Sequence, residues 1–242
     1  MCRWLMLCCL LVSSVQASEL DRLNFITEEY PPFNHVADEQ LKGSSVDILD
    51  AILQHNKSRL NRSDVRVLPW ARGYDTTLEY PNTVLFSTTR SRNRDSLFAW
   101  VGPLAAGRVV LLARRDKGIR IDALSDLIEG GYSVVALRED IGAQALQEGG
   151  VPDNQVRMAV NNVSAMHMLA MGRVDLWAYG EEVAEWLLQE NGHNVADFES
   201  VLLLTEDPLY FAINRQTDAQ LIQLMQDTLD QLRAEGSLPR LD

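Results

Sequence analysis

Short apolar runs alternate with segments of helical periodicity along most of this sequence. Strand-like runs lie, for example, at residues 23–27, 132–137 and 175–178, and the next predicted element after each of these three is a helix. This alternation is typical of α/β proteins, in which helices connect parallel strands and cover the faces of a sheet. We therefore predict an α/β fold with mostly parallel sheets.

The predicted elements are of ordinary length for such a fold. We expect strands at residues 23–27, 65–68, 84–86, 109–113, 132–137, 156–160, 175–178, 201–204 and 209–213. We expect helices at residues 71–79, 142–147, 163–171 and 181–190, one after Ser44 or Ser45, and a last one after Thr217. Each of these hydroxyls is expected to cap its helix, because a side-chain oxygen can accept from a free first-turn amide.

The first 17 residues have the pattern of a secretory signal peptide. Arg3 gives a short positive end, residues 4–12 are apolar, and Ala17 closes a small-residue cleavage pattern. The apolar run is too short to span a bilayer. The alternatives are a buried N-terminal helix and a lipid anchor on Cys8 or Cys9, which the bulky residues before them disfavour. We expect cleavage after Ala17, and therefore export.

Composition excludes several classes of function. All three cysteines lie in the predicted leader, so the remaining 225 residues would hold no thiol for catalysis, disulfides or metal binding. The net charge of −12 becomes −13 after cleavage. A nucleic-acid binder needs a basic face that neutralises phosphates, and the sequence has no run rich in lysine and arginine. We therefore expect neither nucleic acid nor an anionic membrane surface as a partner.

Two motifs could suggest a metal site. Met166 and Met168 flank His167, but residues two apart on a helix point about 200° apart, which favours core packing. The four histidines show no zinc spacing. We expect no metal, no cofactor and no catalytic residue.

Residues 69–103 carry the clearest sign of ligand binding. They read PWARGYDTTLEYPNTVLFSTTRSRNRDSLFAWVGP, which indicates a helix and a strand followed by a polar loop and an aromatic run. The loop places Thr89, Ser91 and Arg94 near the carboxyl end of a strand. An arginine fork can bind both oxygens of a carboxylate, while hydroxyls and backbone amides bind the remaining lone pairs. We predict that Arg94 binds a carboxylate of the ligand.

Several short motifs follow one another in a specific order. They are Tyr30-Pro31-Pro32-Phe33, Gly43, Pro69-Trp70-Ala71-Arg72, the loop through Arg94 to Phe98, Trp100 and Pro103, Leu169, Gly172-Arg173-Val174-Asp175, and a helix ending at Gly236. In this order the chain resembles the bacterial extracellular solute-binding proteins of family 3, the amino-acid-binding type that serves ABC transporters. The resemblance implies a periplasmic-binding-protein type II fold. Two α/β lobes would be joined by two crossing hinge segments, with a ligand cleft between them that closes by hinge bending.

The resemblance also implies a domain organisation and a function. After the signal peptide at 1–17, we expect a first lobe at 19–107 plus 208–242 and a second at 108–207. The expected protein is a periplasmic monomer that captures a small polar, carboxylate-bearing solute, an amino acid or a related compound. It would deliver this small-molecule ligand to an ABC permease in the inner membrane.

The resemblance assigns ligand contacts residue by residue. Tyr30 and Trp70 match the aromatic side chains that enclose the ligand, and Arg94 matches the arginine that holds its α-carboxylate. The alternatives are packing against the proline pair for Tyr30 and a core position for Trp70. The full set of expected contacts is Arg94, Trp70, Tyr30, Thr89, Ser87, Thr27, Ser91, Arg138, Gly180 and Glu181.

The second lobe departs from the family pattern. Gly180 aligns where amino-acid binders place a carboxylate for the ammonium of the ligand. The adjacent Glu181 and Glu182 could replace it, or could form the acidic first turn of a helix. A small loop expected after residue 136 is replaced by bulkier residues, among which Arg138 is a second anion contact or a surface residue. A carboxylate-bearing ligand is therefore better supported than an α-amino acid.

Two other functions are compatible with this fold. Some relatives act as dehydratases in this cleft, and Glu28, Glu29, Glu181 or Glu182 could serve as a general acid or base if desolvated. A buried cleft carboxylate that faces no ligand ammonium would favour such an enzyme. The other function is that of a soluble ligand-sensing partner of a membrane receptor, with the same ligand chemistry.

Overall fold

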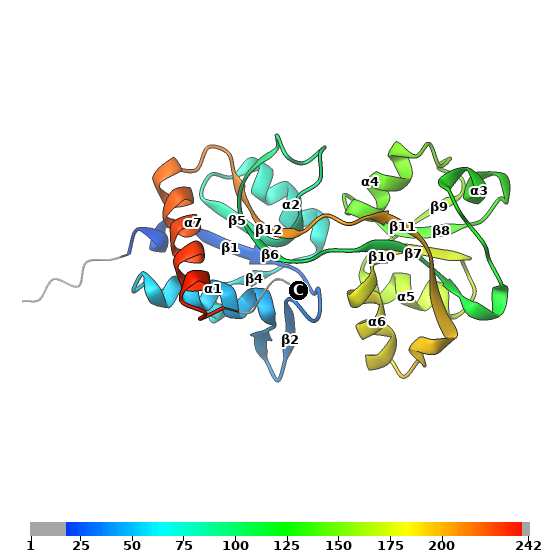
Figure 1. Ribbon diagram of the computed structural model, residues 1–242, viewed down its shortest axis with the longest axis horizontal. Coiled ribbons are helices and arrows are strands. Elements are labelled where there is room, and N and C mark those ends of the chain that lie inside the picture. Colours follow the sequence, from blue (N-terminus) through cyan, green and yellow to red (C-terminus); the bar gives the residue numbers. More distant parts are fainter. Residues whose placement is uncertain (1–17, 239–242) are drawn as a thin grey trace, which may run out of the picture.

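The computed structural model describes residues 18–238, which form two α/β lobes (Figure 1). Each lobe is built around a five-stranded sheet. The predicted signal peptide and all three cysteines lie outside the described residues, as do residues 239–242. In the part described, no helix has the length and apolar character needed to cross a membrane.

The first lobe has the strand order β4-β1-β5-β12-β6. Its strands are β1 (Asn24–Thr27), β4 (Arg66–Val67), β5 (Thr83–Thr89), β6 (Phe98–Ala105) and β12 (Leu209–Asn214), with a hairpin of β2 (His35–Ala37) and β3 (Gln40–Lys42) beside the sheet. Its helices are α1 (Ser44–His55), α2 (Trp70–Glu79) and α7 (Ala219–Ala234). Successive residues of a strand face opposite sides, so Phe25 packs in the core under α1 and α7, and Ile26 in the core under α2.

The second lobe has the strand order β11-β7-β10-β8-β9. Its strands are β7 (Val109–Arg114), β8 (Val134–Leu137), β9 (Val156–Ala159), β10 (Leu176–Gly180) and β11 (Phe198–Thr205). Its helices are α3 (Leu124–Glu129), α4 (Ile141–Glu148), α5 (Asn162–Ala170) and α6 (Glu181–Glu190). Met166 is fully buried against the sheet with Trp177, which agrees with core packing of this thioether. Short 3-10 helices lie at Glu19–Arg22, Arg62–Asp64, Arg115–Lys117 and Val195–Asp197.

Two crossing segments join the lobes and change the expected topology. One leads from β6 to β7 and the other from β11 to β12, and they run side by side in Figure 1. A Cβ atom on Gly107 would lie 2.4 Å from the carbonyl oxygen of Asp207, so the two segments require glycine at this approach. The four strands that they connect pair antiparallel within their sheets. The expectation of mostly parallel sheets is therefore wrong: each sheet has two parallel and two antiparallel strand pairs. The lobe boundaries that we propose, after residues 107 and 207, fall within these segments.

Both predicted helix caps are wrong. Helix α1 has Gly43 as its N-cap, because the chain enters this helix with a positive φ of 124° and the serines lie inside it. Helix α7 is capped by Asp218, whose side chain accepts from the amide of Gln220. The hydroxyl of Thr217 instead accepts from the amide of Asn82 at 2.9 Å.

Candidate ligand site between the lobes

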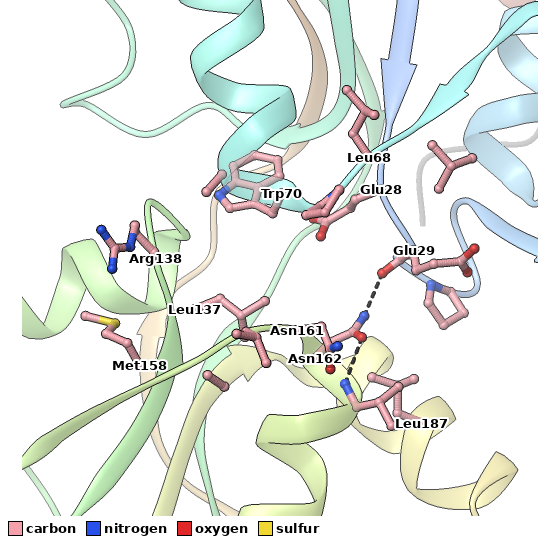
Figure 2. Close-up of a pocket in the computed structure, with 17 residues that line it drawn as sticks. Glu28, Glu29, Leu68, Trp70, Leu137, Arg138, Met158, Asn161, Asn162 and Leu187 are labelled. Carbon is pink, nitrogen blue, oxygen red and sulfur yellow. Dashed lines mark hydrogen bonds between the residues drawn. The ribbon is translucent and has the colours of Figure 1, made fainter.

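A cavity of about 770 Å³ opens between the two lobes. This is in the range of small-molecule sites. Residues of the first lobe form one wall and residues of the second lobe form the other (Figure 2). The labelled lining residues are Glu28, Glu29, Leu68 and Trp70 on one side and Leu137, Arg138, Met158, Asn161, Asn162 and Leu187 on the other.

Several residues that line the cavity lie at or just after the ends of strands. Glu28 follows β1, Leu68 and Trp70 follow β4, Leu137 ends β8, and Asn162 begins the helix after β9. Because the carboxyl ends of parallel strands meet at one edge of a sheet, loops far apart in the sequence converge there. Each lobe therefore presents one such edge to the other.

Glu28 supplies a buried acid to this cavity. The residue is 8% exposed, and burial raises the pKa of its carboxyl well above the usual value. The negative charges of Asp140 and Glu29 raise it further, while Arg94 opposes the rise. No other residue of the described chain donates a hydrogen bond to this carboxyl, which faces the cavity beside Trp70.

Arg94 bridges the two lobes. Its side chain leaves the loop after β5, is 1% exposed, and lies over the rings of Trp70 and Tyr74 at 5.2 and 5.3 Å. Its Nη2 donates to the carbonyl of Glu139 at 2.6 Å, and its Nε donates to Gln144 at 3.0 Å. The sequence predicts that this guanidinium binds a ligand. In the structure, two of its donors instead form hydrogen bonds with the second lobe.

Asp140 is a second buried acid close to Arg94. It is the N-cap residue of α4, and burial raises the pKa of its carboxyl, while Arg94 and the amides of Ile141 and Gly142 oppose the rise. Its Oδ2 is buried without a partner in the part of the chain described. The interior thus contains one cation and two acids.

Tyr30 fills the space beside Gly180. Its ring packs edge-on against Tyr179 with centroids 5.7 Å apart, and burial raises the pKa of its hydroxyl well above the usual range. A Cβ atom on Gly180 would lie 2.4 Å from that hydroxyl oxygen. Position 180 therefore has no room for a larger side chain while Tyr30 stays in place.

Four more of the expected contacts lie in or next to this region. Trp70 begins α2, and its Nε1 is buried without a partner among residues 18–238. The hydroxyl of Thr27, at the end of β1, is equally without a partner there. The carbonyl of Thr89 lies 3.5 Å from Nη1 of Arg94, and Arg138 lines the cavity at an exposed position.

Two expected contacts, Ser87 and Ser91, have other partners. The hydroxyl of Ser87 donates to Oδ1 of Asn34 and shares a hydrogen bond of 2.9 Å with the hydroxyl of Ser45, which accordingly donates it, inside the first lobe. The Oγ of Ser91 lies 3.4 Å from the backbone amide of Arg94 and shapes its loop. Neither residue lines the interlobe cavity.

Glu181 begins α6 near the crossing segments. It pairs with Arg108 at 2.7 Å and accepts from the hydroxyl of Ser200 at 2.5 Å. Partial burial raises its pKa, but these two partners outweigh it and leave the pKa below the usual value. Together with Glu182 it lines a separate cavity of about 60 Å³ beside Tyr30.

Asn162 was not singled out from the sequence as a ligand contact. Its Nδ2 donates across the cleft to the carbonyl of Glu29 at 2.6 Å, a second connection between the lobes. Asp140 was equally missed. Both are polar residues directly after a strand, at the start of a helix, and that pattern is the signal that could have found them.

Comparison with known proteins supports the likeness drawn from the motifs. The family model described as bacterial extracellular solute-binding proteins, family 3, matches residues 23–242. No curated protein matches the chain.

Three solved structures illustrate the similarity of fold. A histidine kinase sensor domain with similarity to periplasmic binding proteins has a TM-score of 0.77 at 21% identity, over 90% of this chain and 93% of that one. The P235GK mutant of ArgBP from T. maritima has a TM-score of 0.73 at 18% identity, over 88% and 90%. An ABC uptake transporter substrate binding protein from Streptococcus pneumoniae with bound histidine has a TM-score of 0.74 at 15% identity, over 89% of each chain. The fold is the periplasmic-binding-protein type II fold, with two lobes joined by two crossing segments.

Proposed function

The chain belongs to the bacterial extracellular solute-binding proteins of family 3, and from this premise we propose that it is a periplasmic solute-binding protein. It captures a small polar solute between its lobes, as a monomer, and delivers it to an ABC permease. The observation that carries the proposal is the cavity of about 770 Å³, to which both lobes contribute. The signal-peptide pattern of residues 1–17 supports export to the periplasm.

A carboxylate on the solute, as the sequence suggests, would bind Arg94. To accept hydrogen bonds from both Nε and Nη2 of Arg94, the carboxylate would have to displace the carbonyl of Glu139 and the side chain of Gln144. Hinge opening between the lobes would free these donors, because both competing acceptors belong to the second lobe.

Native mass spectrometry followed by a thermal-shift screen tests the proposal. The screen uses amino acids, small organic acids and small amines on the purified mature protein. A solute present at 100 times its dissociation constant adds about 2.7 kcal/mol of stability, or roughly 5–10 °C in Tm for a chain of this size. If no compound of any class shifted Tm and the native protein carried no small molecule, the proposal would be wrong.

A sensing role is a second candidate. The histidine kinase sensor domain that shares this fold, with a TM-score of 0.77, supports it. A kinase gene rather than a permease gene beside the coding sequence would favour sensing, and loss of solute uptake on deletion of this gene would favour transport.

An enzymatic role is a third candidate, supported by Glu28. Its buried carboxyl, with a raised pKa and Arg94 nearby, has the setting of a general acid. An enzyme of this kind would convert its ligand during incubation, and a Glu28→Gln variant would bind without conversion. Recovery of an unchanged ligand after prolonged incubation would exclude this role.

A further inference from the structure

The carboxyl of Glu28 is a polar group of the cavity that the protein leaves without a partner. Glu28 is 8% exposed, faces the cavity beside Trp70, and receives no hydrogen bond from residues 18–238. Its main-chain carbonyl accepts from Asn34 at 2.7 Å, which holds this turn in place. A buried carboxylate without a partner is unfavourable, and a ligand of opposite charge would offset that cost.

The charges around Glu28 favour a cation over an anion. Arg94 is the buried cation nearby, and Asp140 is a second buried acid. Glu29 and Arg138 also line the cavity, so with every group ionised three acids stand against two cations, an excess of negative charge. A carboxylate on the ligand would increase this excess, whereas a cation would cancel it.

The direct hydrogen-bond partners of Arg94 make an anionic ligand less favourable still. Its Nη2 and Nε are bound to Glu139 and Gln144, so a carboxylate would have to break two hydrogen bonds before making its own. The space beside Gly180 is filled by Tyr30, which leaves no carboxylate there for an α-ammonium group. The two recognition elements of an α-amino acid are therefore absent or already engaged.

The second-lobe wall of the cavity has exposed apolar side chains beside the polar Arg138, Asn161 and Asn162. Met158 is 54% exposed, Val160 is 85% exposed and Val163 is 38% exposed, and all three line the cavity. Figure 2 shows Met158 and Leu137 on the wall that faces Trp70 and Glu28. Removing these side chains from water would favour a ligand with an apolar part.

We propose that the solute is a small organic cation, an amine or a guanidine that lacks a carboxylate. Its charged group binds the carboxylate of Glu28, and its apolar part lies against Met158, Val160 and Val163. This inference rests on the proposed solute-binding function and names the chemical class of its solute.

A proton and the cation compete for the same carboxyl. The groups that face Glu28 are Arg94, which lowers its pKa, Asp140 and Glu29, which raise it, and the neutral hydroxyls of Tyr30 and Tyr179. In the free protein burial outweighs Arg94, so the carboxyl binds a proton more readily than a free carboxyl does. Binding of a cation releases that proton, and the affinity for the cation falls as the pH is lowered.

Matched pairs of ligands test the charge requirement by calorimetry. Agmatine differs from arginine, and phenethylamine from phenylalanine, by the α-carboxylate alone, and 3-phenylpropionate supplies the carboxylate without the amine. We expect at least one amine to bind tenfold or more tightly than its amino acid, with no heat from phenylpropionate. If an amino acid or a carboxylate bound more tightly than every amine, the inference would be wrong while the solute-binding function stood. Absence of binding by all five compounds and by the wider screen would overturn both.

Substitution of Glu28 tests the contact itself. We expect Glu28→Gln, which keeps shape and removes charge, to weaken amine binding tenfold or more and to abolish proton release. Glu79→Gln is the matched control, because Glu79 is an exposed acid at the far end of α2. Unchanged amine affinity in a folded Glu28→Gln protein would contradict the proposal.

Discussion

The region between the lobes has a packed inner part and an open outer part. The inner part consists of Tyr30, Arg94, Asp140 and Gly180: two donors of Arg94 are bound by the second lobe, and Tyr30 fills the space beside Gly180. The outer part is the cavity of about 770 Å³, where Glu28 has no partner. Arg94 also lines a second cavity of about 550 Å³, and Oδ2 of Asp140 has no partner among residues 18–238, so the contrast between the two parts lies in the hydrogen bonds of Arg94 and Glu28.

The difference follows from how each charge is satisfied. Arg94 is bound by a backbone carbonyl and an amide oxygen of the second lobe, which hold it without a ligand. Glu28 has only the distant influence of Arg94, and burial makes its charged form unfavourable. We therefore expect the inner part to contribute to closure of the lobes, and the outer part to contribute to the proposed selection of the solute.

The largest effect is expected from Arg94→Ala. The substitution leaves Asp140 buried without a compensating cation and removes two hydrogen bonds between the lobes. Because each of these hydrogen bonds has a charged donor, we expect a loss of about 3–5 kcal/mol in the free energy of unfolding, measured by urea denaturation. Arg90→Ala is the control: Arg90 forms an exposed ion pair with Asp95 and lies over the rings of Trp100 and Tyr210, for which we expect a smaller loss of about 1–2 kcal/mol. Equal losses for the two variants would show that the inner part is not held by Arg94.

Gly180→Ala tests the packing of the inner part. The new methyl group would lie 2.4 Å from the hydroxyl oxygen of Tyr30, so we expect a loss of about 1–3 kcal/mol. Tyr30→Phe in the same protein removes the nearest atom and should recover part of this loss. A double-mutant cycle without coupling between the two positions would contradict the close contact.

Glu28→Gln should stabilise the free protein while it weakens amine binding. Because the pKa of Glu28 is raised in the folded state, its contribution to stability is fully present below the unfolded value of 4.5 and is lost as the pH rises through the folded value. Glutamine does not ionise, so it removes this loss. We expect Tm at pH 8 to rise by roughly 2–4 °C, for a gain of about 1 kcal/mol, with no gain at pH 4. A gain that did not depend on pH would point to another cause.

Asn162→Ala should have the smallest effect. It removes the donor to the carbonyl of Glu29, a single hydrogen bond across the cleft. We expect a loss of about 1 kcal/mol in unfolding free energy and a larger radius of gyration of the free protein in small-angle scattering. An unchanged radius of gyration together with unchanged stability would show that this bond does not help to close the lobes.

The sequence predicts the two-lobed α/β architecture better than it predicts individual short elements and helix caps. Alternating runs indicate α/β lobes, but β6 was missed because Gly102 and Pro103 interrupt its apolar pattern. Helix α3 was missed because it has only 6 residues, too few for a clear periodicity. The N-cap was predicted at a serine because serine is a common capping residue. The observed N-cap is Gly43, whose positive φ could not be predicted from the neighbouring sequence.

The sequence also predicts the positions of some site residues better than it predicts their contacts. Motifs place Arg94 and Trp70 at the meeting of the lobes, because their positions follow from local strand and helix ends. The partners of Arg94 could not be foreseen, since Glu139 and Gln144 lie 45 and 50 residues away in the chain. Burial of Glu28 likewise depends on the closing of one lobe on the other, which no local pattern encodes.

Proton release on binding tests most directly whether the open part selects a cation through Glu28. Calorimetric titration of the best-binding amine in buffers of different ionisation enthalpy gives the number of protons released per ligand. Near neutral pH we expect up to about one proton released by the wild-type protein and none by Glu28→Gln. Equal proton release by the two proteins, or uptake of a proton by the wild type, would contradict a cation bound at Glu28.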